Sequence, residues 1–310
     1  MDRLDAMAVL LAVIEAGSLS AASRRLGIPL ATVSRKISDL EAHLKTRLLI
    51  RSSRHVSLTD AGRAYVEASK AILEQVDEAE RTAAGEYTTP RGDLAMSAPV
   101  VFGRLHVLPV VIEFLKIYPE INLRLSLSDR QVNLVEDHID LALRIGNLPD
   151  SNLVATTVGW IRRAAYASPA YLAQRGVPER PEDLHGHECI TFEGLNSPRS
   201  WTFMDGKKEV VVPVHSRLSV STADAAIDAA VAGLGVTRLL SYQATRALAA
   251  GELQIVLEAF EPEPWPVSLI YVGQGLMPLK LRAFMDFAVP RLRERITLQS
   301  VPPGMPTSAG

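Results

Sequence analysis

The sequence predicts a multidomain fold, in which a small and mostly helical N-terminal domain is joined by one long helix to a larger α/β region with two lobes. A chain of 310 residues exceeds what one compact core usually holds. Helical periodicity dominates the first 84 residues, whereas strand-like and helical segments alternate after residue 92. Residues 1–62 carry nine Lys and Arg against six Asp and Glu, although the whole chain has a formal charge of −2.

The composition narrows the class of protein. A hydrophobic content of 47% and a charged content of 22% are typical of soluble globular proteins. The single cysteine excludes an internal disulfide framework and fits a reducing compartment. We find neither the pattern of a signal peptide nor an apolar run of about 18 residues, so no membrane span is expected. The expected location is the cytoplasm.

The first 44 residues predict three helices that are joined by tight turns. Residues 2–16 form an amphipathic pattern that Gly17 ends, and Ser18 or Ser20 can cap a second helix over about 19–26. Gly27-Ile28-Pro29 interrupts the chain before a third helix over 31–44, whose apolar stripe consists of Val33, Ile37, Leu40 and Leu44. Two short helices joined by a Gly-containing turn are typical of a helix-turn-helix, although other helical hairpins resemble it.

Residues 45–62, KTRLLIRSSRHVSLTDAG, predict a β-hairpin that directly follows the third helix. Short strands are expected at about 48–50 and 55–58, around a polar tip at 51–54. A hairpin in this position is a wing, and Arg51 and Arg54 at its tip are suited to hold phosphate or to enter a minor groove. The sequence therefore predicts a winged helix-turn-helix over 1–58.

A long helix is expected to follow, within a linker segment over 59–88. Thr59 is its predicted N-cap, and the pattern continues to about Ala84. Apolar or small side chains recur every three or four residues, as in a coiled-coil seam: Tyr65, Ala68, Ile72, Val76, Ala79 and Ala83. The helix could instead pack on its own domain, but few large apolar residues surround the stripe. We therefore favour a dimer interface.

Residues 89–298 predict a two-lobed α/β region. Strands at 95–98, 121–128 and 139–146 with helices between them form a βαβαβ pattern, which favours a parallel, doubly wound sheet. A second series of strands and helices begins near Val154, and Pro266–Val272 returns as a strand before a closing helix. We expect lobe 1 at about 92–160 and 267–298, lobe 2 at about 161–266 with the ligand cleft between them, and a disordered tail over 299–310.

Motifs along essentially the whole chain resemble the LysR-type transcriptional regulators. In the first domain these are AASRRLGI, VSRKISDLE and the pattern RxxRxVxLTxAG over 51–62. In the larger region they include FGRLHVLPVVIEFLKIYPEINLRLSLSDR, LVEDHIDLALRIGNLPDSNLVA and AAVAGLGV. The resemblance implies a winged helix-turn-helix, a dimerising linker helix and an effector-binding domain similar to periplasmic binding proteins.

The resemblance also implies a function and partners. Such a protein is a bacterial transcriptional regulator and not an enzyme, and it binds partly palindromic double-stranded promoter DNA. It acts as a homodimer or homotetramer, responds to a small effector in the interlobe cleft, and has RNA polymerase as a further partner. No cofactor is expected.

The chain departs from the family pattern at the start of the third helix. The family often has Ser-Gln-Pro where this chain has Pro29-Leu30-Ala31, so the residue that could reach a base edge as Gln is Leu30. A Gly commonly follows that helix, whereas Lys45 stands here, and Leu49 replaces a common Phe. The resemblance therefore does not supply a base preference at Leu30.

The polar face of the third helix supplies the candidate DNA contacts. Arg35 is the best candidate for direct readout, because Arg can bind guanine O6 and N7 through two hydrogen bonds. Thr32, Ser34 and Ser38 are short donors suited to phosphate or water-bridged contacts. The alternative is that Arg35 and Ser38 are solvated side chains on an ordinary surface helix.

Two positions in the larger region suit an anionic effector, for which a carboxylate is the expected group. Ser97 ends the first strand, and Pro99 opens the following helix, whose exposed N–H groups favour an anion. Thr222 occupies the equivalent place in lobe 2. The resemblance adds Ser128, Arg144, Trp201 and Phe203. The two aromatic residues face one side of a strand, which is either the cleft or the core, and Arg144 could instead pair with Asp140 or Glu136.

Other chemistries receive less support. His185, His187 and Cys189 could face one side of a strand as metal ligands, but a fourth ligand is not evident and no metal site is expected. No GxSxG, HExxH or phosphate-loop spacing points to an enzyme. A solute-binding protein would share the α/β region, but residues 1–62 would then have no function.

Overall fold

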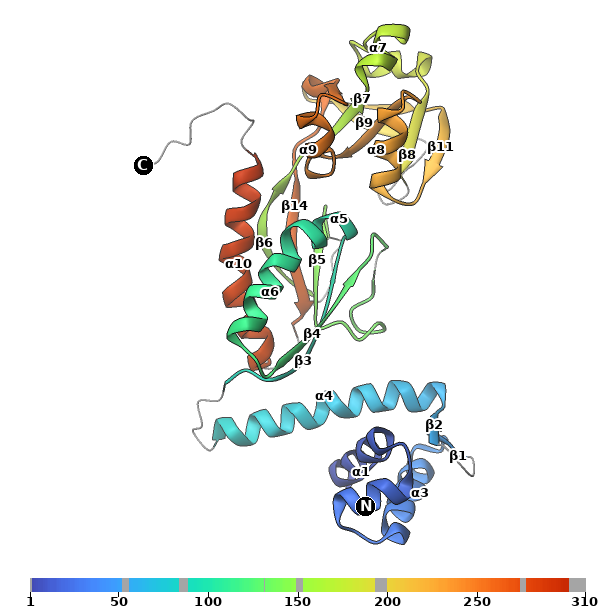
Figure 1. Ribbon diagram of the computed structural model, residues 1–310, viewed down its shortest axis with the longest axis vertical. Coiled ribbons are helices and arrows are strands. Elements are labelled where there is room, and N and C mark those ends of the chain that lie inside the picture. The colour runs from blue at the N-terminus through green and yellow to red at the C-terminus, as the bar shows by residue number, and fades with distance from the viewer. Residues whose placement is uncertain are drawn as a thin grey trace. The chain divides into compact units, whose positions relative to one another are not determined.

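The computed structural model describes residues 2–51, 56–83, 89–130, 132–148, 153–192, 200–273 and 277–300. The chain divides into two compact units, Met1–Gly92 and Asp93–Gly310 (Figure 1). No single helix among the described residues is long and apolar enough to cross a membrane. Only α1 and α2 taken together reach that length, and they are bent by 117°.

Three helices form the body of the N-terminal unit: α1 (Arg3–Ala16), α2 (Leu19–Leu26) and α3 (Leu30–Leu44). The Ser18 hydroxyl accepts the N–H of Ala21 and caps α2, as predicted. Gly27 ends α2 with φ of +66°, which a glycine adopts without the steric cost that a side chain adds. The three helices share a buried core that contains Leu10, Val13, Ala22, Val33, Ile37 and Leu40.

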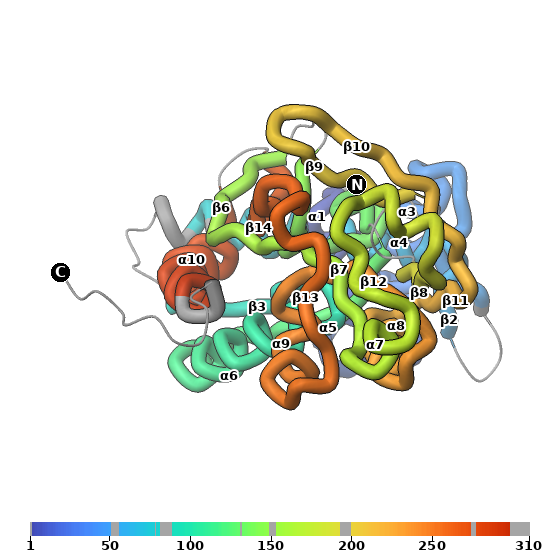
Figure 2. Tube along the Cα trace, turned by 90° about the horizontal axis from the view of Figure 1, so that it is seen from above, coloured from blue at the N-terminus to red at the C-terminus, as the bar shows by residue number. Residues whose placement is uncertain are grey.

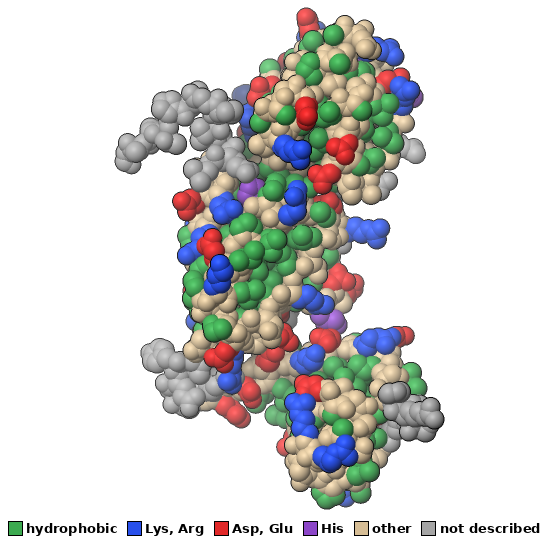
Figure 3. Space-filling view, in the orientation of Figure 1, with side chains coloured by type: hydrophobic (Ala, Val, Ile, Leu, Met, Phe, Trp, Pro, Cys, Tyr) green, Lys and Arg blue, Asp and Glu red, His purple; other side chains and the backbone are tan. Residues whose placement is uncertain are grey.

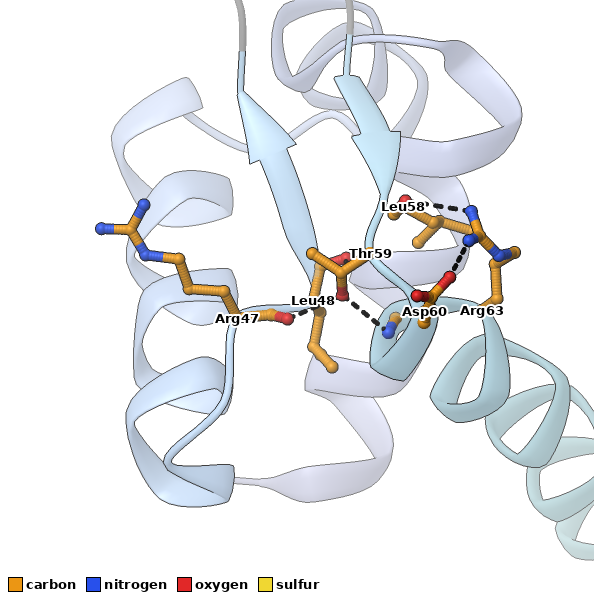
Figure 4. Close-up of polar contacts among 7 residues, drawn as sticks. Arg47, Leu48, Leu58, Thr59, Asp60 and Arg63 are labelled. Atoms are coloured by element: carbon orange, nitrogen blue, oxygen red, sulfur yellow. Dashed lines mark hydrogen bonds and ion pairs between the residues drawn. The ribbon is translucent and has the colours of Figure 1, made fainter.

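The wing follows α3 as two antiparallel strands, β1 (Leu49–Arg51) and β2 (Val56–Leu58). The Glu41 carboxylate accepts the N–H groups of Leu48 and Leu49 at 2.8 and 3.0 Å, so α3 holds the first strand directly. The Thr59 hydroxyl donates to the carbonyl of Arg47 at 2.7 Å and accepts the N–H of Gly62 at 2.9 Å (Figure 4). Thr59 thus links the wing to the following helix.

Helix α4 (Asp60–Ala83) presents two different faces. Val66 and Ser69 are buried, and Val66 belongs to the core that α1 to α3 form. Ala68, Ile72 and Ala79, from the predicted dimer seam, are exposed. The helix therefore packs on its own domain through one face and leaves these three seam residues uncovered within this chain.

Lobe 1 contains a five-stranded sheet of order β4-β3-β5-β14-β6. Its strands are β3 (Gly92–Ala98), β4 (Ile121–Leu127), β5 (Leu141–Ile145), β6 (Leu153–Ile161) and β14 (Trp265–Val272). The helical segments α5 (Val100–Phe102), η1 (Gly103–Val107), α6 (Leu108–Ile117) and α10 (Leu279–Ser300) each bury part of their apolar residues on one face of it. Helices α6 and α10 lie side by side (Figures 1 and 2).

Lobe 2 contains a second five-stranded sheet, of order β11-β8-β12-β7-β13. Its strands are β7 (Arg163–Ala167), β8 (Cys189–Phe192), β11 (Ser216–Val220), β12 (Val236–Leu240) and β13 (Gln254–Val256). Helices α8 (Ala223–Val231) and α9 (Ser241–Ala249) share a core with one face. Helix α7 (Pro169–Arg175) and the hairpin of β9 (Ser200–Asp205) and β10 (Lys208–Pro213) cover the other. Two 3₁₀ segments complete the lobe, η2 (Pro181–Gly186) and η3 (Glu258–Phe260).

The predicted parallel pairing is confirmed for β3 with β5, but both sheets are mixed, because further strands run antiparallel. Strand β14 runs antiparallel to β5 and β6, and β12 runs antiparallel to β7. The reason is the return of the chain, because β14 enters lobe 1 from lobe 2 and runs opposite to β3 and β5. The segment around Val132–Glu136 forms turns, where a short helix was expected.

Candidate functional site

The outer face of α3 displays the side chains that the sequence singled out. Arg35 and Ser38 are exposed, and Thr32 and Ser34 are half-buried. Val33, Ile37 and Leu40 lie on the opposite side of the helix and are fully buried in the domain core. The apolar stripe therefore fixes α3 to its domain, and the polar face remains open to a partner.

The positive charges around α3 divide into paired and unpaired groups. Lys36 forms an ion pair with Asp5, and Arg25 with Glu15 at 2.7 Å. Within the described part of the chain we find no ion pair for four other cations: Arg24, Arg35, Lys45 and Arg47. These four remain available to phosphate groups, which need cations that are not neutralised within the protein.

The wing residues are placed only in part. Arg51 is the last residue of β1 and pairs with Val56 of β2. Arg54, the other predicted contact, lies outside the described residues. Arg47, at the base of the wing, points away from Thr59 (Figure 4) and joins the exposed cations.

In lobe 1, Ser97 and Arg144 lie on the same face of the sheet. Ser97 is fully buried, and its hydroxyl has no hydrogen-bond partner. It pairs in register with Ala142, and Arg144 follows two residues later on β5, on the same face. The Nη2 atom of Arg144 is also buried without a partner, and burial lowers the pKa of this guanidinium. The expected alternative, an ion pair of Arg144 with Asp140 or Glu136, is not formed.

Two hydroxyls that the sequence analysis did not select extend this polar strip. Ser268 on β14 is opposite Arg144 and is 3% exposed. Thr157 on β6 is opposite Ser268, and their hydroxyl oxygens are 3.3 Å apart. A single serine within the apolar strand WPVSLIYV was the available signal, because an isolated hydroxyl in a buried strand requires a partner.

The N-terminus of α5 differs from the expected anion site. The carboxylate of Asp129 accepts the N–H of Val100, the residue after Pro99, at 3.1 Å. Burial raises the pKa of Asp129, and the nearby Asp224 of lobe 2 raises it further. The Ser128 hydroxyl accepts the N–H of Arg130 in the same turn. The expectation of free N–H groups beside Pro99 was therefore wrong at Val100, because a carboxylate of this chain already occupies that donor.

The predicted cleft residues of lobe 2 fall into two groups. Thr222 is exposed and caps α8 by accepting the N–H of Ala225 at 3.4 Å. Trp201 and Phe203, on β9, are 7% and 0% exposed and belong to the core between the sheet and the β9–β10 hairpin. The guanidinium of Arg238 lies 4.3 Å from the centre of the Phe203 ring. The aromatic pair thus faces the core, which was one of its two expected settings.

The three potential metal ligands do not share a strand. His185 is in η2 and its Nδ1 contacts the carbonyl of Glu182, whereas His187 contacts the hydroxyl of Tyr171 at 3.2 Å. Cys189 begins β8, and burial raises the pKa of its thiol to about 12. Among the described residues no group of His, Cys, Asp or Glu is arranged to hold a metal ion.

Comparisons with known proteins match both units. The family model of the bacterial regulatory helix-turn-helix protein, lysR family, matches residues 4–63, and that of the LysR substrate binding domain matches residues 88–293. An HTH-type transcriptional repressor of Pseudomonas aeruginosa is 36% identical over 312 residues, covering 100% of this chain and 98% of the repressor.

Solved structures of two LysR-type regulators also match this chain. The LysR-type regulator CrgA of Neisseria meningitidis is 30% identical with a TM-score of 0.58, over 93% of this chain and 98% of CrgA. The virulence activator AphB of Vibrio cholerae is 28% identical with a TM-score of 0.59, over 93% of this chain and 99% of AphB. A helix-turn-helix with an open cationic face, followed by a two-lobed substrate-binding domain, defines a DNA-binding transcriptional regulator and not an enzyme. This chain belongs to the LysR family of such regulators.

Proposed function

We propose that this regulator acts in the cytoplasm, binds partly palindromic promoter DNA as a homo-oligomer, and changes its activity when a small anionic effector enters the interlobe cleft. The proposed units are the DNA-binding domain over 1–58, the linker helix over 59–88 and the effector-binding domain over 89–298. RNA polymerase is the proposed further partner. The proposed DNA contacts are Thr32, Ser34, Arg35, Ser38, Arg51 and Arg54.

The four unpaired cations on the N-terminal unit support DNA binding by this surface. Each cation that neutralises a phosphate releases condensed counterions, so affinity falls as salt concentration rises. Arg35 combines an exposed side chain with a position on the face opposite the domain core. That combination suits a helix that enters the major groove.

The observation that carries the effector proposal is the unpartnered polar strip of Ser97 and Arg144. A buried guanidinium nitrogen and a buried hydroxyl without partners cost free energy unless a ligand or water satisfies them. Guanidinium and hydroxyl donors together recognise a carboxylate. We place the effector anion at this strip rather than at the α5 N-terminus, where Asp129 would repel it. Pro99, Ser128 and Thr222 remain proposed residues of the cleft wall.

A thermal-shift screen of small carboxylic acids on the full-length protein tests this proposal. At a free ligand concentration of 100 times the Kd, binding stabilises the folded state by about 2.7 kcal/mol. This raises the melting temperature by several degrees. We expect Arg144→Gln to abolish the shift that an effective acid produces.

The matched control is Arg217→Gln, which removes an exposed arginine of lobe 2. It should retain the full shift. A shift of the same size in Arg144→Gln would show that the anion does not bind at this strip. Stabilisation by uncharged analogues alone would show that the effector is not anionic.

An apolar stripe that runs from η1 into α6 supports self-association. Leu105, Leu108 and Ile112 follow each other at intervals of three and four residues and are 37%, 37% and 47% exposed. Figure 3 shows apolar side chains gathered on this part of lobe 1. Exposed apolar stripes of this kind mark protein interfaces. The exposed seam of α4 offers a second interface.

A further inference from the structure

A carboxylate lies beside the polar strip that we assign to the anionic group of the effector. Strands β4, β3 and β5 are neighbours in the lobe 1 sheet. Ser97 is near the end of β3, Arg144 is on β5, and Asp129 is in the turn that follows β4. The N–H of Ser128 donates to the carbonyl of Ala98 at 2.9 Å, which holds this turn against the end of β3. One edge of the sheet therefore carries a hydroxyl between a carboxylate and a guanidinium.

Lobe 2 contributes two more polar groups opposite this edge. Burial raises the pKa of Asp129, and Asp224 in the first turn of α8 is close enough to raise it further. The ring of Tyr242 on α9 packs edge-on against Phe102 of α5, with the ring centres 5.3 Å apart. Tyr242 is 4% exposed, its hydroxyl has no hydrogen-bond partner, and Asp129 adds to the burial that raises its pKa. Two carboxylates and an unsatisfied hydroxyl thus meet where the lobes face each other.

No cation of the described chain compensates for these carboxylates. Neither Asp129 nor Asp224 forms an ion pair within the ranges of residues that the structure describes. A half-buried carboxylate beside a like charge is unfavourable unless a positive charge lies near it. The Tyr242 hydroxyl can also accept a hydrogen bond. An ammonium group meets both requirements, because it carries a positive charge and three N–H donors.

We propose that the effector is an amino acid and that its ammonium group binds between Asp129 and Asp224, beside the Tyr242 hydroxyl. Its carboxylate binds Arg144 and Ser97, so this inference rests on the proposed carboxylate site. Neighbouring strands are about 4.8 Å apart, so roughly 10 Å separates the ends of β4 and β5. The side chains at the two ends shorten this gap, which a small molecule with two opposite charges can span. Because the two carboxylates belong to different lobes, the ammonium group also joins the lobes.

Isothermal titration calorimetry of the full-length protein with a panel of α- and ω-amino acids tests this inference. The amino acid that binds most tightly is then compared with the carboxylic acid that lacks its amine. For the wild-type protein we expect at least about tenfold tighter binding of the amino acid, because hydrogen bonds to charged groups contribute that much. Asp129→Asn should bind the two compounds with similar affinity, since it keeps the acceptor for the N–H of Val100 and loses only the charge.

Asp137→Asn is the matched control, because the Asp137 carboxylate also accepts a backbone N–H, from Asn133 at 2.9 Å, but is exposed. It should retain the full preference for the amino acid. Circular dichroism verifies the fold of each variant. Asp224→Asn, at an exposed position, should also reduce the preference and provides the test if Asp129→Asn does not fold.

Two kinds of result separate this inference from the proposal on which it rests. Equal binding of the two compounds by the wild-type protein, or a full preference in both Asp129→Asn and Asp224→Asn, overturns the inference and leaves the carboxylate site in place. Binding of neither class of compound, or amino-acid binding that Arg144→Gln does not weaken, overturns the carboxylate site as well.

Discussion

Arg35 is the residue for which the structure and the sequence make the same prediction about DNA. It is exposed, has no ion pair within the described chain, and lies opposite the buried stripe of α3. We expect Arg35→Ala to weaken binding to the specific site by about 1–3 kcal/mol, because a bidentate contact to guanine contributes about that much discrimination. Gel-shift titrations with the promoter DNA and with unrelated DNA measure the effect.

Arg25→Ala serves as the control for Arg35, since Arg25 already pairs with Glu15. It should change specific and non-specific binding by similar small amounts. A specific affinity in Arg35→Ala that equals the wild-type value, with the fold intact, would assign base readout to another residue.

His106 is a buried titratable residue whose protonation opposes folding. It is 2% exposed, its Nε2 has no partner, and it packs against Phe102 of lobe 1 and Tyr242 of lobe 2. Burial and, to a lesser extent, the positive charge of Arg295 together lower its pKa to about 4. The unfolded chain, with an ordinary histidine pKa near 6.5, binds a proton first as pH falls.

The pH dependence of stability follows from that difference. Between pH of about 6.5 and 4 the unfolded state holds one proton more than the folded state at this residue, so stability falls as pH falls. The loss is of the order of 3 kcal/mol by pH 4. We expect His106→Phe to lose less stability than the wild-type protein over this range in urea titrations. Parallel pH curves for the two proteins would contradict it.

At the scale of elements, Gly62 fixes the approach of α4 to the wing. A Cβ atom added at Gly62 would lie 2.0 Å from the carbonyl oxygen of Leu48, and backbone cannot move aside cheaply. We expect Gly62→Ala to destabilise the N-terminal unit by about 2–3 kcal/mol, as overpacking does elsewhere. Hydrogen exchange of the α3 and wing amides can locate the loss.

The control for Gly62 is Ala64→Ser, an exposed position on the same helix. It should change stability by about 0.5 kcal/mol at most. Unchanged protection in Gly62→Ala would mean that α4 can shift away from Leu48 without cost.

Local signals in the sequence were sufficient to predict the N-terminal elements. Gly17, Ser18 and Thr59 end or begin helices through interactions with residues at most four positions away. The direction of β14 depends instead on pairing with β5, more than a hundred residues earlier, which no local pattern encodes. The sequence therefore predicted the parallel pairing of β3 with β5 but not the antiparallel strand that makes the sheet mixed.

The candidate site likewise has features that local sequence predicts and features that depend on long-range pairing. The exposure of Arg35 followed from the helical period, whereas the strip of Arg144, Ser268 and Thr157 depends on register across three strands. Trp201 alternates with Phe203 in sequence, but only the packing of the β9–β10 hairpin on lobe 2 determines that both face the core. Asp129 was missed because its role at Val100 joins two segments that are distant in sequence.

At the scale of the whole molecule, the apolar stripe of η1 and α6 predicts how copies of the chain associate. We expect Ile112→Glu to raise the dissociation constant of the oligomer at least tenfold, because a charge would be buried in an apolar interface. Sedimentation velocity over a range of protein concentrations measures it. Val177→Glu, on a similarly exposed apolar residue of lobe 2 (58% against 47%), should leave the association unchanged. An unchanged dissociation constant in Ile112→Glu would indicate that the chains associate through α4 alone.

Strands β6 and β14 have a consequence for motion between the lobes. They pair antiparallel from Leu153 with Val272 up to Ile161 with Trp265, where the chain crosses between lobes. Sliding one strand past the other would break several backbone hydrogen bonds at once, whereas bending both together preserves them. The two-stranded pair therefore permits a bending motion between the lobes and opposes a sliding motion. Effector binding can then shift the two lobes relative to each other most easily along this bending motion.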